Sequence, residues 1–101
     1  MTKEPRTICR TPTPDKKPTS VPSWKFDLLS QEIKSVVASA GADGFLFSKL
    51  AETVAKRLAP DALEKLGSVG WHVTTVKLEM EVRGDLKRVS GSNPQRLVLD
   101  V

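Results

Sequence analysis

Hydrophobic residues recur every three or four positions over residues 26–40, as they do along one face of an α-helix. Gly41 and Gly44 follow, and glycine is the residue that most often ends a helix. The pattern therefore predicts a first helix over residues 26–40, followed by a brief strand over residues 44–47. The apolar stripe of this helix consists of Leu29, Ile33, Val36, Val37 and Ala40.

A second helix is predicted from Ser48 to about Leu58. Serine suits the N-cap position because its hydroxyl accepts a hydrogen bond from an amide of the first turn, and Pro60 lies just beyond the end. The inward face of this helix consists of Leu50, Val54 and Leu58.

The segment after Pro60 predicts a short helical turn over residues 62–66. Asp61 and Glu64 have the spacing of a capping box, and Gly67 follows the turn. This segment makes the link between the second and third long helices longer than the usual three or four residues.

A third long helix is predicted between Ser68, as its N-cap, and Gly84. Its inward stripe consists of Val69, Val73, Val76 and Met80. On about the opposite side, Trp71, Leu78 and Val82 fall within roughly 40° of one another at 100° per residue. A helix that is apolar on two sides is normally buried on two sides, so we expect these three residues to form a contact beyond the main core.

After Gly84 the apolar residues alternate, which is typical of strands. Two short strands are predicted over residues 86–89 and 95–99, and the turn-forming residues 90–94 join them. The core residues expected from this hairpin are Leu86, Val89, Leu97 and Leu99.

The predicted order of helix, strand, two helices and a hairpin resembles that of the winged helix-turn-helix superfamily. The stretch WHVTTVKLEMEVRGDLKRVSGSNPQRLVL is similar to a group of small, uncharacterised bacterial single-domain winged-helix proteins. The resemblance implies an α+β fold over residues 23–101, with a three-helix core and a C-terminal β-hairpin wing. The positions that match the recognition helix and first wing strand are Val73, Val76, Met80, Gly84 and Leu86.

In DNA-binding winged-helix proteins the third helix enters the major groove and the wing touches the backbone. The resemblance therefore implies a DNA-binding function, as in a small transcriptional regulator. The helix positions that would contact DNA are His72, Thr74, Thr75 and Lys77. The hairpin positions are Lys87, Arg88 and Arg96.

The first 22 residues are rich in proline and are expected to form a disordered tail. They hold five of the seven prolines, and few apolar residues that could offset the entropy of ordering. Up to residue 25 the chain has six basic and two acidic residues, whereas the other 76 residues have ten of each. The net charge of +4 therefore belongs to the tail. Such a tail is either a basic arm for phosphates or an acidic partner, or a solvated leader without a role.

Several classes of protein are not expected from the sequence. No apolar run approaches 18 residues and no apolar segment follows the basic N-terminus, so we expect neither a membrane span nor a signal peptide, and a cytoplasmic location. Cys9 is the only cysteine and His72 the only histidine, which argues against a disulfide or a metal site. No catalytic constellation or phosphate-binding loop is present, so we expect no enzyme activity, cofactor or small-molecule ligand.

Two functions remain open at this point. The first is binding of double-stranded DNA through the third helix and the wing. The second is a protein-interaction or dimerisation module that uses the outer stripe of Trp71, Leu78 and Val82. That stripe would be buried either by a second copy of the chain or by residues 21–24 or 60–66 of the same chain.

Overall fold

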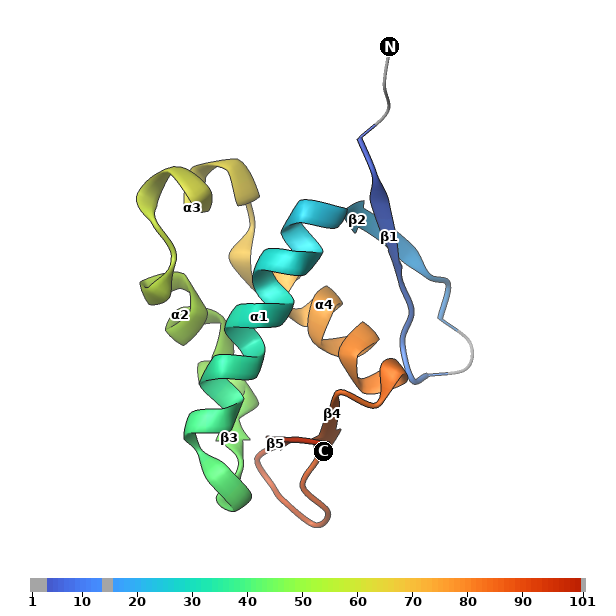
Figure 1. Ribbon diagram of the computed structural model, residues 1–101. Coiled ribbons are helices and arrows are strands. Elements are labelled where there is room, and N and C mark those ends of the chain that lie inside the picture. Colours follow the sequence, from blue (N-terminus) through green and yellow to red (C-terminus); the bar gives the residue numbers. More distant parts are fainter. Residues whose placement is uncertain (1–3, 14–15, 101) are drawn as a thin grey trace.

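The computed structural model describes residues 4–13 and 16–100, which form an α+β fold of four α-helices and two small antiparallel sheets (Figure 1). The helices are α1 (Ser23–Ser39), α2 (Phe47–Arg57), α3 (Pro60–Leu66) and α4 (Val69–Arg83), with a 3-10 turn, η1 (Gly41–Asp43). The strands are β1 (Arg6–Cys9), β2 (Thr19–Pro22), β3 (Phe45–Leu46), β4 (Leu86–Arg88) and β5 (Arg96–Leu99). The α+β class and the three long helices predicted from the sequence are confirmed.

The core lies where α1, α2 and α4 pack against one another. Each helix contributes the apolar stripe that its periodicity predicts, and each fully buried aliphatic side chain adds roughly 1.5–3 kcal/mol of stability. Val69 lies at the edge of this core and is only partly buried. The fully buried helical residues include Leu29, Ile33, Leu50, Val54, Val73, Val76 and Met80.

The ends of α4 follow the prediction. The Ser68 hydroxyl accepts a hydrogen bond from the Trp71 amide at 3.3 Å, and Gly84 ends the helix with a φ of 82°, a left-handed conformation that suits glycine. The Ser48 cap is wrong, because α2 begins one residue earlier, at Phe47. The Phe47 amide donates to the carbonyl oxygen of Gln95 at 3.0 Å, so a neighbouring strand takes over the role of the cap.

The capping box at Asp61 is also wrong. Ala59 occupies the N-cap of α3 and no side chain caps the helix. Pro60 is the first helical residue, a position where its missing N–H costs nothing and its fixed φ favours the helix. Proline therefore begins α3 rather than only ending α2.

The second sheet has the strand order β3–β5–β4. Phe45 is paired with Leu97, and Leu86 with Leu99. The sheet closes the lower end of the core, because Leu86 and Leu97 are buried. Gly44 precedes β3 with a φ of 83°, and a Cβ there would lie 2.9 Å from Cγ2 of Val89, so only glycine fits between the strands.

The N-terminal segment forms a hairpin, so the prediction of a disordered tail over residues 1–22 is wrong for its described part. Strands β1 and β2 are antiparallel, with Thr7 opposite Val21, and they lie beside α1 and α4 on the side away from α2 and α3 (Figure 1). Cys9 and Val21 are buried in the same core as the helices. Residues 1–3 and 14–15 of the predicted tail lie outside the described residues.

The prolines flank the strands rather than interrupt their hydrogen bonds. The Ser23 amide donates to the Pro5 carbonyl at 2.9 Å, so the next pair, Arg6 and Pro22, is one that exchanges no backbone hydrogen bonds. The missing N–H of Pro22 therefore costs the ladder nothing. Because the chain enters α1 directly from this strand, the helix starts at Ser23, three residues before the predicted position.

None of the helices within the described residues is long and apolar enough to cross a membrane.

The thiol of Cys9 offers a test of hairpin docking. Burial raises the pKa of this thiol, the Glu79 carboxylate adds to the rise, and Arg83 partly offsets it. Since the thiolate is the reactive form, we expect a disulfide reagent to modify the native protein at least about tenfold more slowly than the urea-unfolded protein. Equal rates in the two states would show that the hairpin is not docked.

Candidate functional site on helix α4

Helix α4 has one face that the rest of the chain leaves uncovered, which we call the α4 face. Trp71 is 50% exposed and Val82 36% exposed, Thr74 is exposed, and Thr75 and Leu78 are half-buried. At 100° per residue, these positions span about 100° on the side opposite the core stripe. The α4 face therefore contains no charged residue. It consists of Trp71, Thr74, Thr75, Leu78 and Val82.

The predicted cover of this face from within the chain is wrong for Trp71 and Val82, because both side chains remain exposed beside the hairpin and α3. Its polar atoms are also partly occupied. The Thr75 hydroxyl donates to the Trp71 carbonyl at 2.8 Å, and His72 Nδ1 lies 2.6 Å from the Ser68 carbonyl oxygen. What the α4 face offers is thus mainly apolar surface and the hydroxyl of Thr74.

One flank of the α4 face is built around the carboxylate of Glu79, of which only 1% is exposed. Arg10 donates to it from its backbone amide at 2.8 Å, from Nε at 3.0 Å and from Nη2 at 2.8 Å. Arg83, one turn further along α4, donates from Nε at 2.7 Å, and its guanidinium lies over the Phe26 ring at 4.6 Å. A single carboxylate therefore joins the hairpin to α4.

Burial of Glu79 alone would raise its pKa. The hydrogen bonds from Arg10 and Arg83 favour the ionised form more strongly, and the pKa falls from 4.5 to about 2. Glu79 is therefore ionised at neutral pH despite its burial.

The other flank is built around Glu81, of which 7% of the side chain is exposed. Lys77 Nζ lies 3.0 Å from one carboxylate oxygen, and Arg88 Nε lies 2.7 Å from the other. Lys77 is itself buried, with Nζ 4.4 Å from the centre of the Phe47 ring, and this burial lowers its pKa although Glu81 opposes the shift. Lys77 thus serves as an internal counter-ion.

The seven residues predicted to bind DNA are not brought together on one accessible surface. The prediction for Lys77 is wrong, because that side chain is buried against Phe47 and Glu81. Thr74 is exposed on the α4 face, whereas His72 and Thr75 direct polar atoms to carbonyls of their own helix.

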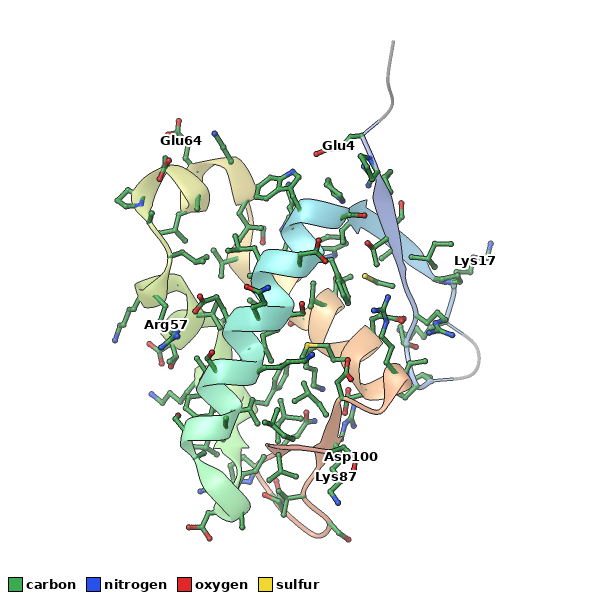
Figure 2. The ribbon with its side chains drawn as sticks, in the orientation of Figure 1. Glu4, Lys17, Arg57, Glu64, Lys87 and Asp100 are labelled. Atoms are coloured by element: carbon green, nitrogen blue, oxygen red, sulfur yellow. The ribbon has the colours of Figure 1, made fainter. Side chains whose placement is uncertain are left out.

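The three hairpin residues of that set differ in the same way. Lys87 is exposed, and in Figure 2 its side chain points outward from the β4–β5 hairpin. Arg88 is half-exposed but is bonded to Glu81, and Arg96 Nη1 donates to the Gly44 carbonyl at 3.4 Å. The hairpin is therefore less basic in effect than its sequence indicates.

Sequence reasoning missed the pairing of Arg10 with Glu79. The spacing of four residues from Glu79 to Arg83 and from Lys77 to Glu81 was a signal for two of the ion pairs. Nothing local connects Arg10 to a helix 69 residues away, because only the fold brings them together.

Two other features of the described residues are less suited to a site. A hollow of about 510 Å³ between α1 and α3 is lined by Trp24, Leu28, Asp61, Ala62 and Lys65. Throughout residues 4–13 and 16–100, no group of three or more His, Cys, Asp or Glu side chains could hold a metal ion. The α4 face is the feature that combines exposed apolar residues with organised charge on both sides.

The molecule is thus a small α+β protein in which one helix carries an exposed apolar face between two charged flanks. The chain belongs to DUF6958, a family of unknown function, whose model matches residues 6–97. The match begins at the first residue of β1, so the N-terminal hairpin is part of the family's domain. No curated protein and no solved structure matches the chain.

The Glu79 cluster should make stability depend on acid pH. The carboxylate has a pKa of about 2 in the folded protein and 4.5 as its ordinary value. Its ionised form therefore stabilises the fold above about pH 4.5, and this contribution is lost as the pH falls towards 2. Urea titrations of Glu79→Gln should show a loss of about 2 kcal/mol at pH 7 and a smaller change on acidification than in the unsubstituted protein.

The matched control is Glu52→Gln, which removes an exposed ion pair with Lys49 at 3.4 Å. We expect this control to change the free energy of unfolding by less than about 0.5 kcal/mol. Equal effects of the two substitutions would contradict a structural role for Glu79.

Proposed function

We propose that this protein is a winged-helix interaction module that binds a protein partner through the α4 face. The observation that carries the proposal is the exposure of Trp71 and Val82 on a helix face without charged residues. Large aromatic residues are enriched at the centres of protein interfaces, where their burial contributes much of the binding energy.

The order of the elements supports the winged-helix assignment. Helices α1, α2 and α4 form the core, β3 lies between the first two, and β4 and β5 follow as a hairpin. The strand order β3–β5–β4 places the last strand between the other two, as the assignment requires. Helix α3 is then an addition in the link between α2 and the recognition helix.

The charges around α4 favour a protein over DNA as the partner. Binding of duplex DNA depends on Lys and Arg side chains that neutralise phosphates, and of the residues expected to do so Lys77 is buried. Arg88 and Arg96 already donate to groups within the chain. Base edges, moreover, reward hydrogen-bonding groups rather than the indole and aliphatic side chains of this face.

DNA binding, as in a small cytoplasmic transcriptional regulator, is the second candidate function. It is favoured by the same strand order and by the exposed Lys87 on the hairpin that would be the wing. Thr74 is then the residue of α4 best placed to reach a base edge.

The main proposal is tested with peptides selected from a displayed library for binding to the full chain. We expect Trp71→Asp to weaken most selected peptides by about 30-fold, since loss of a central aromatic residue costs about 2 kcal/mol of binding. The control is Ile8→Asp, which changes an exposed apolar residue on the outside of the hairpin. Peptides that bind both variants as well as the unsubstituted protein would show that the α4 face is not the interface.

The second candidate is tested by titrating mixed-sequence and selected duplexes. Under the main proposal we expect binding no tighter than about 10⁻⁴ M, the weak end of the non-specific range, and no effect of Trp71→Asp on it. A duplex bound at about 10⁻⁸ M or tighter, with binding weakened by Lys87→Ala and Thr74→Ala, would establish the DNA function instead.

A further inference from the structure

The exposed residues of the α4 face recur at the spacing of a coiled-coil seam. Trp71, Thr75, Leu78 and Val82 are separated by four, three and four residues, which corresponds to alternating d and a positions of a heptad. They span eleven residues, or about 16 Å along the helix axis. A seam of this kind fits a second helix lying alongside, because the knobs of one helix fill the holes of the other.

The positions that flank this seam are e and g of the same heptad, and they are Glu79 and Glu81. Residues at e and g select the partner through their charge. From the sequence alone, two glutamates in these places predict a partner helix rich in lysine and arginine. In the fold, however, each of the two carboxylates is buried beneath two cations.

The outermost charged groups on both flanks are therefore guanidinium groups. The Arg10, Arg83 and Arg88 side chains are 55%, 42% and 51% exposed, whereas Glu79 and Glu81 are 1% and 7% exposed. Each flank has two cations for one carboxylate and thus one surplus positive charge. The effective sign of the e and g positions is the reverse of what the sequence of α4 indicates.

The arginines also keep donors for a partner. A guanidinium has five N–H groups in a planar fork that matches a carboxylate. Arg83 and Arg88 bind the glutamates through Nε. Within the contacts of the described residues, their Nη groups have no carboxylate partner, so each can pair with an acidic side chain outside the chain.

We propose that the partner is an amphipathic helix whose apolar stripe packs on the α4 face and whose two flanks are acidic. This inference rests on the proposed function and adds the chemistry of the partner. A second copy of the chain fits less well, because pairing of α4 with α4 would bring surplus positive charge on each flank against the same charge on the other copy. Duplex DNA would use the cationic flanks and leave the seam unmatched.

The test uses the full chain and two synthetic helical peptides slightly longer than the α4 face. Both carry Leu at a and d, and they differ only in having Glu or Lys at every e and g position. We expect fluorescence anisotropy to show the Glu peptide binding at least about tenfold more tightly than the Lys peptide at low salt. The difference should shrink at high salt, because exposed charges are then screened.

The variant Arg88→Gln removes one guanidinium from a flank and leaves Lys77 to pair with Glu81. We expect it to weaken the Glu peptide about fivefold and to strengthen the Lys peptide. The control is Arg57→Gln, because Arg57 is also half-exposed and also binds a glutamate, Glu32, through Nε at 2.6 Å. Arg57 lies on α2, away from the α4 face (Figure 2), and its substitution should change neither affinity.

Four results would overturn the inference. Equal binding of both peptides, lost with Trp71→Asp, would leave the proposed function intact and refute the acidic partner. Tighter binding of the Lys peptide would show that the glutamates, not the arginines, face the partner. Self-association that Trp71→Asp abolishes would identify a second copy as the occupant. Binding of a duplex but of neither peptide, or of nothing at all, would contradict both the inference and the proposed function.

Discussion

The arrangement of this protein depends on the removal of one carboxylate from water. A buried carboxylate is stable only when several donors surround it, because its desolvation costs several kcal/mol. Glu79 obtains its donors from two separate places, the N-terminal segment through Arg10 and its own helix through Arg83. Neither place is sufficient alone, so the N-terminal hairpin and α4 determine each other's position.

This constraint gives α4 three different surroundings around its circumference. One side packs in the core through Val73, Val76 and Met80, and the two adjoining sides carry carboxylates covered by cations. Only the remaining side meets solvent. A chain of 101 residues has a small core, and the hairpin enlarges it with Cys9 and Val21 while it also shapes the surface beside α4.

The helices and the C-terminal hairpin could be predicted because their signals are local. Periodicity identified the inward residues of α1, α2 and α4, and Ser68 and Gly84 marked the ends of α4. The N-terminal hairpin could not be predicted in this way. Its prolines argue against regular structure, and what orders it is the burial of Cys9 and Val21 by helices far along the chain.

The candidate site was predictable in its residues but not in its electrostatics. The outer stripe of Trp71, Leu78 and Val82 followed from helical geometry, although its burial within the chain did not occur. Lys77 was assigned to the surface by its charge, yet it is buried because Phe47 and Glu81 surround its ammonium group. Such inversions arise from tertiary contacts, which no local pattern records.

The hairpin has a consequence for how the N-terminus governs the electric field of the molecule. Arg10 is contributed by a segment that precedes every helix, yet its charge is displayed beside α4, which ends more than seventy residues later. Proteolytic trimming before residue 11 would remove a cation and uncover an anion at the same point of the surface. The local potential on that side of α4 would then change sign without any change in the helix itself, so the length of the N-terminus sets which ligands the helix attracts.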